Sequence, residues 1–236
     1  MNAIAASTKL HLNKREQTFV VPLWITAAVA VISIVISLLF WRAGSQPGSA
    51  GWIRGSQNNP GIAYALVSFL GYMGVQAVAT TFPFALTLGA TRRGFVTGTL
   101  LWSVLTSAYL TLILMLLTLL ETATDHWFTG FYIFDVHVLG AGDLTRLLPV
   151  VFLGSLTVLT LGGVFGASWV RLGSRGPIVL GVGLLLVAAA ALLILIPSAA
   201  QIIAGFQLWW LALAAVGVIA ASWAGTWLLL RPAVVR

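Results

Sequence analysis

Six long runs of apolar residues, separated by shorter polar segments, dominate the pattern along this chain of 236 residues. A helix of about 20 apolar residues crosses a hydrocarbon core roughly 30 Å thick, and each run reaches that length. The runs are too long and too uniformly apolar for the alternating strands of a membrane barrel. The pattern therefore predicts an all-α integral membrane protein with six transmembrane helices. The predicted spans cover residues 19–41, 62–88, 96–120, 147–170, 177–197 and 208–230.

The first apolar run follows basic residues, as the apolar part of a signal peptide would. Its 23 residues exceed the roughly 7–15 apolar residues of such a signal, so we interpret it as a retained span. Before it, apolar and polar residues alternate, which is typical of a short helix lying on the inner membrane surface. The sequence thus predicts a cytoplasmic interfacial segment over 1–18, followed by one six-helix transmembrane domain over 19–236.

The segments between the spans differ in character. Residues 42–61 are rich in Gly, Ser, Gln, Asn and Pro, which predicts an irregular linker. Residues 121–146 form the largest segment outside the membrane, and they are expected to make an interfacial cap. This outer segment holds four of the five acidic residues and a run of aromatic residues, namely Trp127, Phe128, Phe131, Tyr132 and Phe134. Residues 197–207 follow the fifth span and are consistent with a short re-entrant helix.

Two acidic residues and two histidines of the outer segment are candidate metal ligands. They are Asp125, His126, Asp135 and His137. Their spacing matches no strong metal-binding motif, so no metal site is predicted.

The basic residues indicate the orientation of the chain, because cytoplasmic loops carry an excess of Lys and Arg. With the N-terminus inside, the inner segments hold three times as many basic residues as the outer ones. The inner residues are Lys9, Lys14, Arg15, Arg92, Arg93, Arg171, Arg175, Arg231 and Arg236, and the outer ones are Arg42, Arg54 and Arg146. Both termini are therefore predicted to be cytoplasmic.

Composition excludes several classes of protein. Hydrophobic residues make up 60% of the chain and charged residues 7%, with a mean hydropathy of +1.04. Soluble domains carry about 25% charged residues, so a soluble globule or a disordered chain is excluded. The net charge is +7, but the basic residues are not clustered on a polar face, so nucleic-acid binding is not expected. The absence of cysteine excludes disulfides and thiolate chemistry.

The spans carry little that could perform chemistry. No Asp, Glu, Lys or Arg lies near the middle of any span, which argues against a proton- or ion-coupled carrier. The three histidines lie outside the spans, so paired haem ligands are absent, and the phosphate-binding pattern G-x-x-x-x-G-K-[ST] is also absent. We predict that the chain is not an enzyme and needs no cofactor of its own. Energy for uphill work would have to come from another chain.

The second and third spans are the most polar. Their polar residues are typical of helix packing and interhelical hydrogen bonds, and alternatively they line a route for an amphipathic substrate. Pro83 predicts a kink in the second span, and the pairs Gly94-x3-Gly98 and Gly162-x3-Gly166 allow close approach of helices. The candidate translocation path comprises Gln76, Thr80, Thr81, Ser103, Thr106 and Tyr109.

Two stretches resemble a known transporter family. Residues 10–16, followed by 19–22, resemble the basic interfacial helix that leads into the first span of ABC-2 type ABC transporter permeases. Residues 84–95 are similar to that family's inner turn after span two, where a Gly and a small residue precede Arg and an aromatic residue. The plan of six spans, inner termini and no nucleotide site is also similar. On physics alone, this basic turn is either a positive-inside anchor or a docking element.

The resemblance implies a function for the inner turn. It would be the coupling turn that docks onto an ATP-binding subunit, with Arg92 and Arg93 contacting that subunit. The residues of this turn are Gly89, Ala90, Thr91, Arg92, Arg93, Gly94 and Phe95. ATP and Mg would be bound by two copies of the partner subunit. A second permease, either a copy or a paralogue, would complete the transporter.

The resemblance further implies export of a drug, peptide or lipid, which would pass between the permeases along spans one, two and five. The excess of basic residues, the retained first span and the short loops indicate a bacterial plasma membrane. Many family members have their main outer hairpin between spans five and six, whereas here the larger outer segment joins spans three and four. Two other functions stay open. One is an ATP-independent carrier or channel, and the other is a membrane scaffold or assembly protein that binds its partner through residues 121–146.

Overall fold

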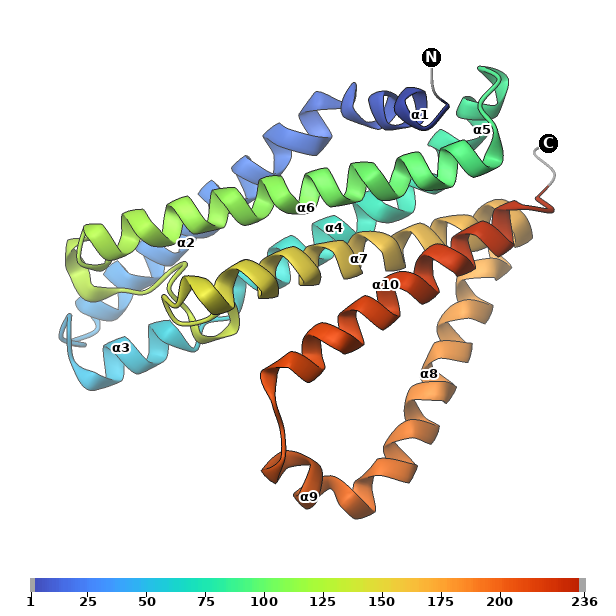
Figure 1. The fold of residues 1–236 in the computed structure, drawn as a ribbon. Helices are drawn as coiled ribbons and strands as arrows, with labels where there is room; N and C mark the ends of the chain where they lie inside the picture. Colours follow the sequence, from blue (N-terminus) through green and yellow to red (C-terminus); the bar gives the residue numbers. More distant parts are fainter. Residues whose placement is uncertain (1–2, 234–236) are drawn as a thin grey trace. The chain divides into compact units, whose positions relative to one another are not determined.

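The computed structural model describes residues 3–233, without the side chains of Phe128 and Thr129. Residues 1 and 2 of the predicted interfacial segment, the Phe128 side chain and Arg236 therefore lie outside the described part. The helices are α1 (Ala3–Leu12), α2 (Val21–Arg42), α3 (Ala50–Gln57), α4 (Gly61–Ala79), α5 (Thr81–Thr87), α6 (Arg92–Ala123), α7 (Leu144–Leu172), α8 (Arg175–Leu195), α9 (Ala199–Ala204) and α10 (Leu208–Leu230) (Figure 1). Short π-helices η1 (Glu16–Val20) and η2 (His126–Gly130) and 3₁₀ turns η3 (His137–Leu139) and η4 (Ile196–Ser198) complete the secondary structure.

The described residues contain six helical segments long and apolar enough to cross a membrane, which confirms the all-α prediction and the expected number of helices of spanning length. They are Glu16–Arg42, Ala50–Thr87, Arg92–Ala123, Leu144–Leu172, Arg175–Ala204 and Leu208–Leu230. These features indicate a multi-pass membrane protein. The placement of both termini in the cytoplasm stays a prediction.

Two connections are more regular than the sequence suggested. The prediction of an irregular linker over 42–61 is wrong for its middle, where α3 forms. Ser49 begins this helix as its N-cap, because its hydroxyl accepts a hydrogen bond from the Trp52 amide (3.3 Å). Trp52 and Ser56 are buried, so packing supports a helix that composition alone did not indicate. The connection 197–207 contains the short helix α9.

The second span breaks where Pro83 predicts a kink. Helix α4 ends at Ala79 and α5 begins at Thr81. Pro83 has no N–H to donate to the Ala79 carbonyl, so the helical hydrogen bonds cannot continue through this point. The break sets α5 apart as a short helix directly before the inner turn.

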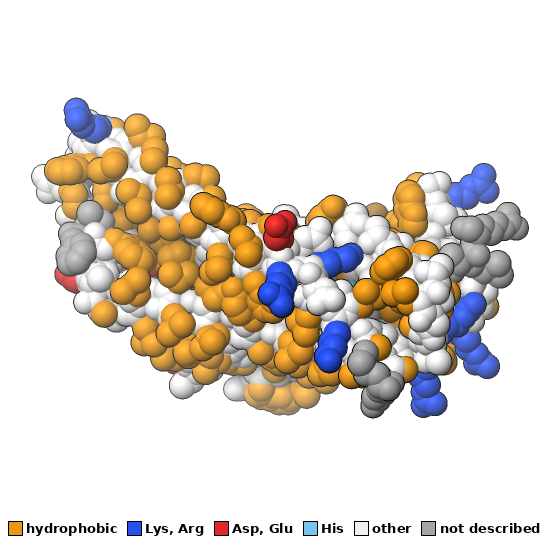
Figure 2. All heavy atoms as spheres, turned by 90° about the horizontal axis from the view of Figure 1, so that it is seen from above, with side chains coloured by type: hydrophobic (Ala, Val, Ile, Leu, Met, Phe, Trp, Pro, Cys, Tyr) orange, Lys and Arg blue, Asp and Glu red, His pale blue; other side chains and the backbone are white. Residues whose placement is uncertain are grey.

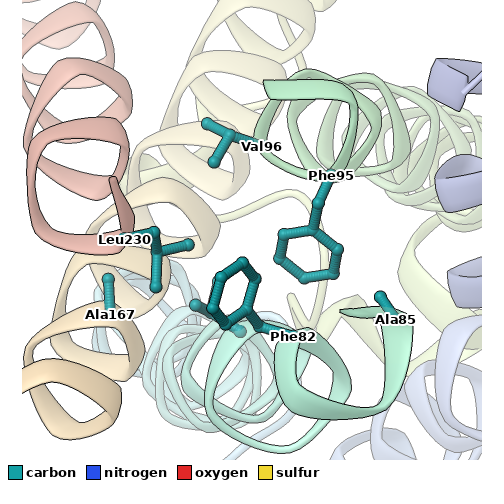
Figure 3. Close-up of a cluster of buried hydrophobic side chains, with 7 residues drawn as sticks. Phe82, Ala85, Phe95, Val96, Ala167 and Leu230 are labelled. Atoms are coloured by element: carbon teal, nitrogen blue, oxygen red, sulfur yellow. The ribbon is translucent and has the colours of Figure 1, made fainter. Parts of the chain in front are cut away.

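The fold divides into two compact units, each built from several parts of the chain. Unit 1 comprises residues 1–11, 72–101 and 157–236, and unit 2 comprises residues 12–71 and 102–156. The core of unit 1 joins α4, α5, α6, α7 and α10 through buried side chains (Figure 3). Its members are Val78, Phe82, Ala85, Phe95, Val96, Ala167 and Leu230.

Within unit 1, glycines bring α4 and α7 into close contact, as the pair Gly162-x3-Gly166 predicts. A Cβ added at Gly166 would lie 2.5 Å from the Val75 carbonyl oxygen, which leaves room only for glycine. A Cβ on Gly74 would similarly meet the backbone of Leu159. Small residues allow this close approach, and dispersion contacts then hold the helices together without a hydrophobic driving force in lipid.

Two helices of unit 1 present apolar side chains outward. No residue in the most apolar 18-residue stretch of α8 is buried, and α8 diverges from α10 before α9 leads back to it (Figure 1). The buried residues of α10 are Ser222, Thr226 and Leu230, which form one stripe on its C-terminal half. Apolar side chains also cover much of the face drawn in Figure 2. Such a surface suits contact with lipid or another apolar helix.

In unit 2, the start of the first span packs on α6. The Tyr109 hydroxyl donates to the Phe19 carbonyl (3.0 Å), and the two rings meet edge to face at 5.0 Å. The Trp102 indole N–H points to the Thr18 hydroxyl at 3.4 Å. These contacts fix the short π-helix η1, through which the chain enters α2.

Candidate functional site

The inner turn between α5 and α6 is closed by two local capping motifs. The Gly89 amide donates to Leu86 (3.0 Å) and the Ala90 amide donates to Ala85 (3.0 Å), which is the Schellman pattern. Gly89 has a φ of +80°, a conformation that glycine adopts without strain. Thr91 then begins α6, because its hydroxyl accepts from the Gly94 amide (3.1 Å). The sequence Gly-Ala-Thr thus ends one helix and starts the next with little freedom between them.

The seven residues predicted for docking differ in exposure. Gly94 and Phe95 are buried, and Ala90 and Arg92 are half-buried. The exposed residues are Gly89, Thr91 and Arg93, and Leu88 just before the turn is exposed as well. A partner approaching this turn would therefore meet Arg93 as its main charged group.

Arg92 is engaged within the chain. Its Nη1 donates to the carbonyl oxygens of Leu230 and Arg231, each at 2.7 Å. Both oxygens lie at the C-terminal end of α10, where carbonyls lack partners in the helix and the helix dipole is negative. A cation is well placed there, and this contact links residues 138 and 139 positions apart in the sequence.

Helix α1 packs against the start of α6 and supports the turn from one side. A Cβ at Gly98 would lie 2.6 Å from the Ser7 Cβ, so the pair Gly94-x3-Gly98 does serve close helix approach. The Thr8 hydroxyl is 3.1 Å from the Gly98 carbonyl. The predicted N-terminal helix is present, but its buried face is polar, with Ser7, Thr8 and His11.

His11 contributes a specific polar contact to this packing. Its Nε2 lies 2.9 Å from the Thr99 hydroxyl, and that hydroxyl donates its own proton to the Phe95 carbonyl. His11 therefore donates through Nε2–H. The His11 ring also faces Phe95, with centroids 5.6 Å apart.

The six candidate path residues fall into two groups, one in each unit. In unit 1, Gln76 is half-buried, Thr81 is buried, and the exposed Thr80 donates to the Gln76 carbonyl (2.7 Å). In unit 2, Ser103 and Thr106 are buried, while Tyr109 holds Phe19. An apolar groove of about 440 Å³ lies between α6 and α7 in unit 2, and none of these three residues lines it. Its lining is Ala108, Thr111, Leu112, Met115, Leu148, Pro149 and Phe152.

The outer segment is organised around Glu121, at the end of α6. Its side chain is fully buried, and its two oxygens accept the amides of Ile133 (2.8 Å) and Phe134 (2.7 Å). Phe131, Ile133 and Phe134 are themselves buried, so the apolar part of the segment faces inward. The sequence places Glu121 only at an outer end, as one of the four acidic residues of the predicted segment 121–146. The signal available in the sequence was a single acidic residue at the end of an apolar run, a position where a charge is unfavourable.

A His–Asp pair closes the same segment. His126 Nε2 lies 3.0 Å from Asp135 Oδ2, and the His126 ring stacks on Tyr132 with centroids 3.8 Å apart. Burial raises the pKa of the Tyr132 hydroxyl, and the neighbouring Asp135 and Asp125 carboxylates raise it further. Within the described residues, no group of three or more His, Cys, Asp or Glu is placed to hold a metal ion.

Asp143 caps the N-terminus of α7. Its Oδ1 accepts the Thr145 hydroxyl (2.6 Å) and the Thr145 amide (2.9 Å). These two hydrogen bonds lower the pKa of the Asp143 carboxyl. Its other oxygen, Oδ2, pairs with Nε of exposed Arg146 at 3.2 Å. The negative charge of Asp143 and the positive charge of Arg146 therefore offset each other at this helix end.

Comparisons with protein families, with curated proteins and with solved structures found no match to this chain. Functional inference therefore starts from the chain's own residues.

Proposed function

We propose that this chain is the membrane-spanning permease subunit of an ATP-driven ABC transporter of the ABC-2 type. It exports a hydrophobic or amphipathic substrate, and a separate ATP-binding subunit docks at the 89–95 turn, where Arg93 is the exposed cation. The observation that carries the proposal is the inner turn, a stiff connection between two spans that exposes Arg93 beside a buried aromatic residue. The similarity of residues 84–95 to the family's inner turn adds to it.

The chemistry of the turn suits a protein partner better than a simple anchor. An anchor needs only positive charge near the membrane surface. Here the backbone is fixed by a C-cap, an N-cap and a buried Phe95, so the exposed Arg93 is held on a stiff frame. The guanidinium of an exposed arginine on such a frame can form two parallel hydrogen bonds with a carboxylate of a partner. We assign ATP and Mg to that partner, in two copies, and place the complex in a bacterial plasma membrane with a second permease.

Charge reversal at Arg93 is expected to detach the partner. Arg93→Glu replaces the exposed cation with an anion, and we expect roughly tenfold or more weaker retention of the ATP-binding subunit. The measurement is gentle-detergent purification of the tagged chain, mass spectrometry of co-purifying proteins, and vanadate-sensitive ATPase activity of the eluate. Arg54→Glu is the matched control, because Arg54 is exposed on α3 and predicted to lie outside.

Equal ATPase retention by Arg93→Glu and the unaltered chain would remove the docking assignment. A preparation without any ATPase, repeated in two detergents, would favour the carrier or channel and the scaffold functions instead.

A further inference from the structure

The two adjacent arginines of the inner turn face different surroundings. Arg93 is exposed, whereas the Arg92 guanidinium rests on the Leu230 and Arg231 carbonyls at 2.7 Å. Arg92 is the first residue of α6, where the helix dipole disfavours a cation. The favourable partner of its charge is therefore the C-terminal end of α10.

Apolar packing joins the same two elements beneath this contact. Leu230 is fully buried in the cluster that contains Phe82 of α5 and Phe95 of α6 (Figure 3). The two aromatic rings meet at a centroid distance of 5.1 Å. Closely packed side chains pass a displacement on rather than absorb it. The turn and the end of α10 are thus held together by the charge-assisted hydrogen bonds of Arg92 and by one cluster of buried apolar side chains.

Helix α10 is held mainly at this end. Its buried residues are Ser222, Thr226 and Leu230, all in the C-terminal half, and the residues from Leu208 to Ala221 are exposed or half-buried. When the held end of such a helix tilts, its free end moves through a larger distance. The contact at Arg92 therefore lies where a small motion of the turn has a large effect on the far end of α10.

We infer that Arg92 is a positioning residue that transmits movement of the inner turn to α10, whereas Arg93 provides the contact with the partner. This division of roles rests on the proposed function. The two arginines therefore differ in what their loss does. Loss of Arg92 leaves docking of the partner intact and disconnects α10 from the turn, whereas a single docking patch would lose both properties together.

The contact itself is tested on the chain without any partner. The chain has no cysteine, so spin labels can be placed at Leu88→Cys and Leu228→Cys, two exposed positions within unit 1. In lipid nanodiscs, we expect a narrow distance distribution for the unaltered chain and for Arg93→Ala. Arg92→Ala should broaden it, and Arg92→Lys should restore part of the order. Identical distributions for Arg92→Ala and Arg93→Ala would overturn the inference.

Transmission is tested in the complex with the co-purified ATPase. Labels at Leu185→Cys on α8 and Leu213→Cys on α10 report movement within unit 1 when ATP and vanadate are added. We expect a shift of the mean distance in the unaltered complex and none in Arg92→Ala, although that variant keeps its ATPase. Partner loss in Arg92→Ala equal to that in Arg93→Glu would overturn the division of roles. Absence of any ATPase from the unaltered chain would overturn the proposed function and the transmission role, while the partner-free distances still decide the contact.

Discussion

Replacing Gly166 with leucine is expected to prevent recovery of a folded, monodisperse protein. Even the Cβ of alanine at this position would lie 2.5 Å from the Val75 carbonyl oxygen and 3.0 Å from the Val78 Cβ. Both atoms belong to α4, and a carbonyl oxygen within a helix cannot rotate away. For Gly166→Ala, overpacking should lower the free energy of unfolding by about 1–3 kcal/mol, and leucine should cost more.

Gly163→Ala is the matched control, three residues earlier on α7. Its Cβ would lie 3.6 Å from Val78 Cγ2, an ordinary contact. Because alanine favours a helix over glycine by up to about 1 kcal/mol, this variant should be as stable as the unaltered chain or slightly more so. Unfolding in detergent can be followed by the fluorescence of the 10 tryptophans. Equal stability of Gly166→Ala and Gly163→Ala would mean that α4 and α7 do not meet at this point.

The glycine pairs illustrate what the sequence predicts well. Spans, the break at Pro83 and close approach at Gly166 all depend on local composition and spacing, so they can be inferred without the fold. The helix caps at Gly89 and Thr91 likewise depend only on residues that are close in the sequence. Helix α3 was missed because its short stretch is polar in composition, and burial of Trp52 depends on packing with Phe131, whose ring lies 5.3 Å away.

Contacts between distant residues limit what the sequence predicts about the site. The arginine pair 92–93 reads as one basic patch, and nothing local shows that Arg92 reaches carbonyls 138 residues later. Likewise, Glu121 looks like a charge at a membrane surface until the chain returns at Ile133 and Phe134. In both cases a side chain forms hydrogen bonds with backbone groups of another segment, and the pattern of hydrophobic residues gives no information about such contacts. Charge and hydropathy identify such residues as candidates, and the fold shows which backbone groups they contact.

Removing the Glu121 carboxylate is expected to release the outer segment. In Glu121→Ala, the amides of Ile133 and Phe134 lose their acceptors while their residues stay buried. Each unsatisfied buried donor costs about 1–3 kcal/mol, and the cavity left by the side chain adds to this. Glu121→Gln keeps one acceptor oxygen but turns an amide donor toward the other N–H, so its effect should be intermediate. Hydrogen–deuterium exchange at these two amides measures the release directly.

Glu16→Ala is the control, because Glu16 is the chain's other glutamate and is exposed. Exchange at Ile133 and Phe134 should rise in the order unaltered chain, Glu121→Gln, Glu121→Ala, and it should not change in Glu16→Ala. Unchanged exchange in Glu121→Ala would show that the carboxylate does not hold the segment. The same variant also separates the candidate functions, because a scaffold that binds through residues 121–146 would lose its partner on this release. A permease docked at Arg93 would keep its ATPase, since the docking turn belongs to unit 1 and Glu121 to unit 2.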